Sequence, residues 1–315
     1  MLNKPFPVRV GIDEVATETQ KCDGFAFFCL PEAYVDDFTA ETKKLLKASG
    51  LSSFHGVDCK DHNSSAFADF LSLAHTFLRK SPQGFTACRM FSEKMKTELL
   101  GFGDRLVKGA VEKALGGGNP AVSVLQPYFL PLAALAAVSR ELAPSVEMRV
   151  DMDEHTSFRD LAAAAHQVGP VSINAATLLK GIYNGYAMNL HERTPLLPDD
   201  GVKVMKDSKS ALIQAADVIG HFAMNHMFMR LGHMSKKKIA RAKLLADAFG
   251  SDVDGFDPTG KATLSNNDFI LVTDGSFTFK VAWQVTKPPS DPELMSNWPK
   301  DDGMLGEGAK HAREE

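Results

Sequence analysis

Residues 211–224 are apolar on almost every side of the predicted helix, yet they carry a carboxylate at their centre. A helix of this composition is normally buried. Gln214, Asp217 and His221 follow the i, i+3, i+7 spacing that places side chains on one stripe of a helix. Because an unpaired carboxylate is costly to bury, Asp217 needs a partner, which can be a cation, a metal ion or a hydrogen-bond network. The alternative is a structural role, in which Asp217 caps a neighbouring loop.

The composition excludes several classes of protein. The chain has 315 residues and 44% hydrophobic content, which is ordinary for a globular protein with a sizeable core. The longest apolar stretch, residues 122–138, is interrupted by Gln126, Pro127 and Pro131, so no membrane partner is expected. There is no apolar signal core at the amino terminus and no CxxC pair among the four cysteines. We therefore expect a cytoplasmic protein with reduced thiols.

The charge pattern leaves nucleic acid open as a partner. The net charge of −4 argues against a globally basic nucleic-acid-binding protein. A local basic cluster follows the Asp217 segment and consists of Lys236, Lys237, Lys238, Arg241 and Lys243. A solvated helix face is the ordinary explanation of such a cluster. An edge that binds phosphate groups is the alternative.

Local patterns predict an α/β protein. Alternation of apolar and polar residues indicates strands at residues 8–13 and 146–151, and the apolar run at residues 24–30 indicates another. Short strands are also expected at residues 52–57 and 202–205. Helical periodicity dominates residues 64–142, which we expect to form a helical insertion. Further helices are expected at residues 31–48, 156–168, 173–190 and 235–249. Strands interleaved with helices favour a mixed central sheet flanked by helices.

The end of the chain shows two further patterns. Asp274-Gly275 stands between two alternating apolar runs, which predicts a C-terminal β-hairpin at about residues 266–285. Residues 288–315 are polar and contain too few apolar residues to pack, so we expect a flexible tail there. Residues 1–287 are therefore expected to form a single domain.

Three aspartates stand out by their positions. Asp13 and Asp151 each close a predicted strand, so both should emerge at the carboxyl end of the sheet, where ligands of α/β proteins usually bind. Together with Asp217 from the packed helix they would form an oxygen cage for Mg²⁺ or Mn²⁺. Each Asp alone is more often a turn former or a helix cap. Asp153 would replace Asp151 as the ligand if the strand ends two residues later.

Short motifs around these aspartates occur in a particular order. Ile12-Asp13-Glu14 ends the first strand, Val150-Asp151 ends a later one, and Asp207-Ser208-Lys209 leads into Ile213-Gln214-Ala215-Ala216-Asp217. This order resembles the family called domain of unknown function 3800, over about residues 8–231. The resemblance implies a ribonuclease H-like fold of the retroviral-integrase-like superfamily. It also implies that Asp13, Asp151 and Asp217 are the catalytic, metal-binding carboxylates of a nuclease-like site, and that Gln214 supports them or orients the substrate.

The chain departs from the family pattern at two positions. Val15 follows Asp13-Glu14 where the family usually has Ser. In the predicted strand Ser53-Phe54-His55-Gly56, Ser53 stands where relatives usually carry Glu, so one carboxylate is missing. Alternation points Glu14 away from Asp13, which makes Asp58 the better substitute for that Glu.

Further polar residues are candidates for the rim of the site. His55 would act as a proton shuttle, or it is simply a polar residue at a strand end. Asp58 and Lys60 follow it closely, and Lys60 would help to guide a nucleic-acid backbone together with the basic cluster. His221 shares the stripe of Asp217 and is expected to be its hydrogen-bond partner rather than a metal ligand.

The sequence is compatible with two functions. The first is a divalent-metal-dependent nuclease that hydrolyses phosphodiesters, in which the ions activate water and neutralise charge on the phosphate. The second is a catalytically degenerate ribonuclease H-like module for binding or assembly. Ser53 and the net negative charge favour the second function, and Phe222 to Leu231 would then form the interface of a homo-oligomer.

Overall fold

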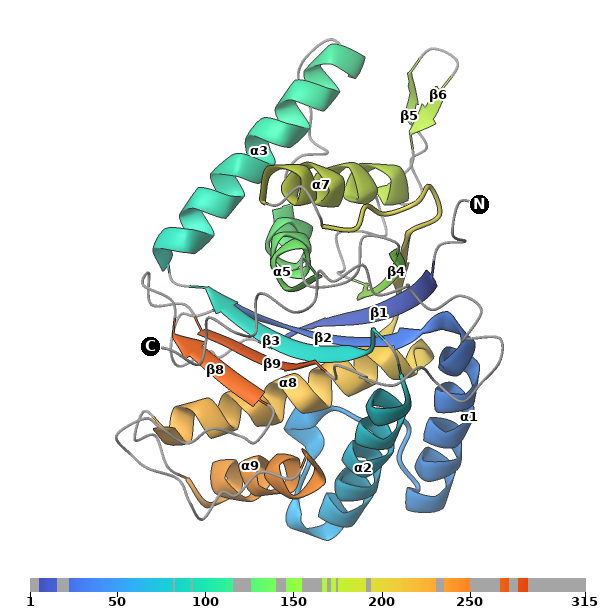
Figure 1. Ribbon diagram of the computed structural model, residues 1–315, viewed down its shortest axis with the longest axis vertical. Coiled ribbons are helices and arrows are strands. Elements are labelled where there is room, and N and C mark those ends of the chain that lie inside the picture. Colours follow the sequence, from blue (N-terminus) through green and yellow to red (C-terminus); the bar gives the residue numbers. More distant parts are fainter. Residues whose placement is uncertain are drawn as a thin grey trace, which may run out of the picture.

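A mixed sheet runs through the middle of the molecule, with helices on both of its faces (Figure 1). The computed structural model describes residues 6–15, 23–81, 83–91, 93–115, 126–139, 146–154, 166–168, 171–173, 175–190, 194–230, 235–249, 267–271 and 277–282. Within these residues the sheet has seven strands in the order β7-β4-β1-β2-β3-β9-β8. β1 is parallel to β4 and β4 to β7, while the remaining neighbours are antiparallel. The strands are β1 (Phe6–Glu14), β2 (Asp23–Pro31), β3 (Phe85–Phe91), β4 (Val146–Asp153), β7 (Val202–Met205), β8 (Asn267–Leu271) and β9 (Phe277–Ala282).

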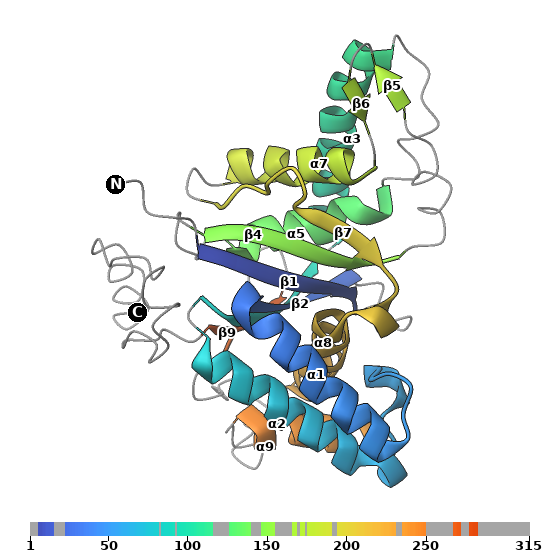
Figure 2. The same ribbon diagram turned by 90° about the vertical axis from the view of Figure 1, so that its right-hand side faces the viewer.

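Two groups of helices cover the two faces of the sheet, as both views show (Figures 1 and 2). One face carries α3 (Glu93–Leu115), η3 (Gln126–Tyr128), α5 (Phe129–Ser139) and α7 (Ala175–Leu190). The opposite face carries α1 (Glu32–Ser49), α2 (Ser64–Lys80), α8 (Ala211–Arg230) and α9 (Lys236–Phe249). The short 3-10 turns η1 (Gly56–Asp58), η2 (Asp61–Asn63) and η4 (Asp207–Lys209) connect elements on the α8 side, and β5 (His166–Val168) pairs with β6 (Val171–Ile173) in a separate small hairpin. The molecule is therefore a helix–sheet–helix sandwich with a core on each side of the sheet.

The alternation in β1 distributes its side chains between the two cores. Val8, Val10 and Ile12 are at most 2% exposed and pack into the core under α5 and α7. Gly11 lies on the opposite face, where a Cβ atom would come within 2.3 Å of the backbone of Leu212 in α8. Only glycine permits so close an approach, so α8 lies directly on the first strand.

The prediction that the Asp217 helix is buried on almost every side is confirmed. All residues from Ala211 to Gly220 are buried, and α8 extends to Arg230. Phe222, Ala223 and Met224 also lie in the chain's own second core, with Phe222 against Phe67 of α2. The segment Phe222 to Leu231 was expected to form an oligomer interface, but its first three residues pack inside the chain's own core.

Two predictions about the third strand are wrong. Residues 52–57 do not form a strand, since they run as irregular backbone into η1. The strand that pairs with β2 is β3, which interrupts the helical insertion expected over residues 64–142. Both faces of β3 are buried, with Phe85, Ala87 and Phe91 in one core and Cys88 and Met90 in the other. A strand buried on both faces shows no alternation, and Thr86 and Arg89 also interrupt the apolar run of β3, so its sequence did not indicate a strand.

The predicted C-terminal hairpin is confirmed, and it belongs to the central sheet. β8 and β9 pair antiparallel, and β9 also pairs with β3, so the hairpin extends the central sheet. Of the helix expected at residues 156–168, only 166–168 are described, and they form β5. The expected tail at residues 288–315 lies outside the described residues. No helix in the described part of the chain is long and apolar enough to cross a membrane.

Gly11→Ala should destabilise the protein strongly, because the added methyl group collides with the backbone of α8 rather than with a movable side chain. We expect a loss of about 3 kcal/mol or more in the free energy of unfolding, measured by urea denaturation. The matched control is Gly181→Ala in α7, where nothing lies within 4 Å of the added atom. That substitution should raise stability by up to about 1 kcal/mol, since alanine favours the helix. Equal effects of the two substitutions would contradict the close contact.

Candidate functional site

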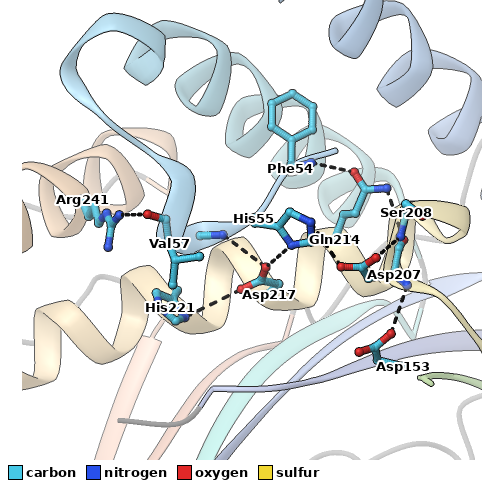
Figure 3. Close-up of polar contacts among 11 residues, drawn as sticks. Phe54, His55, Val57, Asp153, Asp207, Ser208, Gln214, Asp217, His221 and Arg241 are labelled. Atoms are coloured by element: carbon cyan, nitrogen blue, oxygen red, sulfur yellow. Dashed lines mark hydrogen bonds and ion pairs between the residues drawn. The ribbon is translucent and has the colours of Figure 1, made fainter. Parts of the chain in front are cut away.

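Four aspartates gather where β1 and β4 end beside the start of α8. Asp13 and Asp153 directly follow the paired residues Ile12 and Met152 of the two parallel strands. Asp207 lies in η4 and donates its backbone N–H to Asp153 Oδ1 at 3.1 Å. Asp217 projects from α8 toward the same edge (Figure 3). The carboxyl edge of the sheet therefore concentrates negative charge where α/β proteins usually bind ligands.

Among these aspartates, Asp13 has the most strongly raised pKa. Burial raises the pKa of Asp13 well above the ordinary value of an aspartate, and the charge of Asp217 raises it further, followed by the charges of Asp153 and Asp207. Burial also raises the pKa of Asp153, and the charge of Asp207 adds to this effect. Carboxyl groups whose pKa is raised by burial and by neighbouring charges are typical of functional sites.

His55 lies between two of these carboxylates. Its Nδ1 is 3.2 Å from Asp217 Oδ2, and its Nε2 is 3.2 Å from Asp207 Oδ2 (Figure 3). The hydrogen bond to Asp217 raises the pKa of His55 to about 9 although burial opposes it, and the charge of Asp207 contributes in the same direction. The imidazole is therefore protonated at neutral pH and neutralises part of the charge of the cluster.

The segment that carries His55 is held against α8 by backbone contacts. Gln214 Oε1 accepts the N–H of Phe54 at 3.0 Å, and Gln214 Nε2 donates to the carbonyl of Asp207 at 3.3 Å. The N–H of Gly56 donates to Asp217 Oδ2 at 3.2 Å, and a Cβ on Gly56 would lie 2.5 Å from the Cβ of His221. Gln214 thus joins the His55 segment to the turn before α8.

Arg241 of α9 fixes the far end of the same segment. Its guanidinium donates to the carbonyl oxygens of Val57 at 2.6 Å and of Cys59 at 3.0 Å. His221 lies between this anchor and Asp217, but its Nδ1 is 3.7 Å from Asp217 Oδ1, which is beyond a hydrogen bond. His55 and Gly56 are therefore the hydrogen-bond partners of Asp217, and the expectation for His221 is not met.

Asp151 has partners of its own, away from the other carboxylates. Its Oδ1 accepts Arg9 Nε at 3.0 Å, and its Oδ2 accepts the hydroxyl of Ser210 at 3.2 Å. Arg9 also binds Glu32 of α1 at 3.0 Å. Asp151 thus joins β1, β4 and the start of α8, whereas Asp153, two residues later on the same face, faces Asp207. The structure places the alternative ligand Asp153, rather than Asp151, with Asp13 and Asp217.

The remaining rim candidates lie beside the cluster rather than in it. Asp58 and Lys60 are exposed. Asp58 donates its backbone N–H to the carbonyl of His55 at 2.9 Å, and its carboxylate acts on the imidazole through its charge. Ser53 is half-buried next to Phe54, outside any strand. Asp207 was quoted above only as part of a motif, yet it contacts both His55 and Asp153. Its place in a turn just before α8 was the available signal.

The donor set fits a divalent cation by its chemistry. The carboxylates of Asp13, Asp153, Asp207 and Asp217 are hard oxygen ligands of the kind that Mg²⁺ and Mn²⁺ prefer, and positive charge would relieve the repulsion on Asp13. Among the described residues, no three His, Cys, Asp or Glu side chains form a ready-made metal cage. Asp207 and Asp217 direct oxygens at His55 instead. A cation would therefore compete with His55 for these two carboxylates.

Comparisons with known proteins add no family assignment. No family model matches the chain, and a search of curated proteins finds no significant relative. The geometry of this site and the motifs around its aspartates therefore carry the functional proposal.

His55 should make the stability of the protein depend on pH in the presence of a chelator. Its pKa is raised in the folded state, so its contribution is complete below the unfolded value of 6.5 and is lost as the pH rises through about 9. The free energy of unfolding should therefore decrease over this window. In His55→Gln the decrease should be smaller, while His62→Gln on the exposed turn η2 should behave like the wild type. An unchanged slope in His55→Gln would contradict the ion pairs with Asp207 and Asp217.

Asp151→Asn and Asp153→Asn should have opposite effects. Asp151→Asn breaks a buried ion pair with Arg9 and should cost about 2–4 kcal/mol in urea denaturation, with little change in Mn²⁺ affinity. Asp153→Asn should leave stability unchanged or slightly higher, because it removes a repulsive charge, but it should weaken Mn²⁺ binding by about tenfold or more in calorimetry. Loss of Mn²⁺ binding in Asp151→Asn alone would reverse this assignment.

Proposed function

We propose that the chain is a ribonuclease H-like, divalent-metal-dependent hydrolase of phosphodiester bonds in nucleic acid. The observation that carries this proposal is the cluster of Asp13, Asp153, Asp207 and Asp217 at the carboxyl edge of the sheet, in which Asp13 resists ionisation. The mixed sheet flanked by helices is compatible with the fold that the resemblance implies. The match between the Asp-Glu and Gln-x-Ala-Asp motifs and the residues that converge here supports the same function.

Each residue of the cluster would have its own role. Asp13, Asp153 and Asp217 would hold Mg²⁺ or Mn²⁺, and Asp207 would complete the set from the turn before α8. When bound, the metal would activate water and stabilise the negative charge that develops on the phosphate. His55 would keep the oxygens of Asp207 and Asp217 oriented before the metal arrives. Gln214 and Arg241 would position the segment that carries His55.

The basic cluster on α9 supplies a surface for the nucleic-acid backbone next to this edge. Lys236, Lys237 and Lys243 are exposed, and the charges of Lys237 and Arg241 act on His221 beside Asp217. Arg241 joins α9 directly to η1. The phosphates of a bound strand would therefore find positive charge close to a carboxylate cluster that would otherwise repel them.

Incubation of the full chain with single-stranded and duplex RNA and DNA, in Mg²⁺ or Mn²⁺ and in chelator, tests the proposal. We expect metal-dependent cleavage, and a fall of at least about 100-fold in Asp13→Asn and Asp217→Asn. Asp69→Asn, on the exposed face of α2, is the matched control and should retain full activity. No cleavage of any substrate, together with no change in melting temperature on adding metal, would rule out the hydrolase and favour the binding or assembly module.

A further inference from the structure

The carboxylate cluster lies between two groups of positive side chains, along the direction of α8. In Figure 3, Arg241 lies at one end of a line of polar side chains along the helix, Asp207 and Ser208 lie at the other end, and Asp217 and His55 lie between them. The turn η4 continues this line at the end of Asp207, and the start of α9 continues it at the end of Arg241. The cluster is therefore in the middle of this line rather than at its end.

The η4 flank consists of Lys206 and Lys209, which stand on either side of Asp207 in the sequence. Both side chains are exposed, and the N–H of Lys209 donates to the carbonyl of Lys206 at 2.9 Å, which closes the turn. Asp207 directs its oxygens to His55 and to the N–H of Ser208. In the described contacts neither lysine side chain has an acidic partner. Both positive charges are therefore available to a ligand that approaches the cluster from this side.

The α9 flank consists of Lys236 and Lys237, which are exposed in the first turn of the helix. The charge of Lys237 acts on His221, one turn beyond Asp217, and on Cys59 after η1, so this flank lies close to α8 and η1. The amino end of a helix dipole is positive, and lysines placed there are unfavourable unless an anion is near. The composition of this turn therefore favours a negatively charged ligand.

A long polyanion is the ligand that fits two basic flanks with a carboxylate cluster between them. α8 rises about 1.5 Å per residue, so residues 211–221, which run past the cluster, cover about 15 Å. One strand of nucleic acid places about four phosphates over this length, since successive phosphates lie about 3.4 Å apart along the axis of a duplex. A mononucleotide is too short to reach both flanks. In a longer strand the outer phosphates would contact the lysines, and an inner phosphate would lie at the cluster.

We propose that one strand of nucleic acid lies along α8 and contacts the η4 flank on one side of the cluster and the α9 flank on the other, so that the bond that is cut is an internal one. This inference rests on the proposed hydrolase function and adds the substrate class, a strand that continues in both directions from the cut. An enzyme that removes terminal nucleotides needs to hold the strand on one side of the metal only. The basic η4 flank is therefore the feature that favours internal cleavage.

Variants that neutralise each flank test the path of the strand. Binding of the full chain to single-stranded and duplex oligonucleotides that are long enough to cover both flanks is measured by fluorescence anisotropy in Ca²⁺ at several salt concentrations. For a single strand, Lys206→Gln with Lys209→Gln should reduce the slope of log affinity against log salt by about 1.4, because each lost phosphate contact contributes about 0.7. Lys236→Gln with Lys237→Gln should reduce it by the same amount.

Two control variants distinguish a phosphate contact from a general effect of charge or structure. Lys43→Gln with Lys47→Gln makes the same change in net charge at exposed positions of α1 and should leave the slope as in the wild type. Lys206→Arg with Lys209→Arg keeps the charge of the η4 flank and should also keep the slope. Neutralised η4 lysines that behave like the α1 control would overturn the inference, because the strand would then contact α9 alone.

Circular substrates distinguish internal from terminal cleavage. A circle has no ends, so cutting circular single-stranded DNA or RNA, or closed duplex DNA, requires attack at an internal bond. We expect the full chain to linearise circles in Mg²⁺ or Mn²⁺. Neutralising the η4 flank should raise KM by about tenfold with little change in kcat, because these lysines bind the strand on both sides of the reaction barrier equally.

The outcomes distinguish this inference from the hydrolase proposal. Cleavage of linear strands with circles left intact would overturn the internal cut and leave the hydrolase standing. Reduced salt slopes in both flank variants, without cleavage of any substrate, would overturn the hydrolase and with it the internal cut, and would keep α8 and its two flanks as a surface that binds a strand.

Discussion

The direct contact between α8 and β1 determines where every residue of the candidate site lies. Because residue 11 has no side chain, the backbone of Leu212 and Ile213 lies against the strand itself. One turn further along the helix, Asp217 reaches the end of the sheet, and the turn before the helix brings Asp207 to Asp153. A wider spacing between helix and strand would separate these carboxylates by the thickness of a side-chain layer and would remove the repulsion that acts on Asp13.

The two aspartates of β4 show how one strand can combine stability with chemistry. Asp151 is neutralised by Arg9 and binds Ser210, which also accepts the N–H of Ile213 in the first turn of α8. Asp153 faces other carboxylates, and the described contacts give it backbone N–H groups, those of Asp207 and Glu154, rather than a cationic side chain as hydrogen-bond donors. The first interaction fastens the helix to the sheet, and the second keeps a charge in an unfavourable place. Unfavourable charge of this kind is tolerated where the surrounding structure is held firmly.

The parts of the fold that depend on local patterns could be predicted from the sequence. β1 and β4 follow from alternation, β2 from its continuous apolar run, the hairpin from Asp274-Gly275, and the burial of α8 from its apolar surface. β3 could not be predicted, because it is buried on both faces and lacks alternation, and Thr86 and Arg89 also interrupt its apolar run. Asp151 and Asp153 could not be distinguished either, since they share one face of β4 and only the position of Arg9 decides which of them is neutralised. The role of Asp207 could not be predicted, because the turn that carries it reaches Asp153 and His55 only when α8 is packed against the sheet.

The pairing of β9 with β3 also bears on how the chain folds. Of the strand pairs in the described residues, this one joins the segments that are furthest apart in the sequence. β3 is synthesised early, so its outer edge stays unpaired until β9 has been made. The strands β1, β2, β4 and β7 can assemble before then. An edge that stays open for so long presents unpaired N–H and C=O groups to other nascent chains. The late hairpin therefore acts as a cover for that edge, and the yield of folded protein should depend on its arrival.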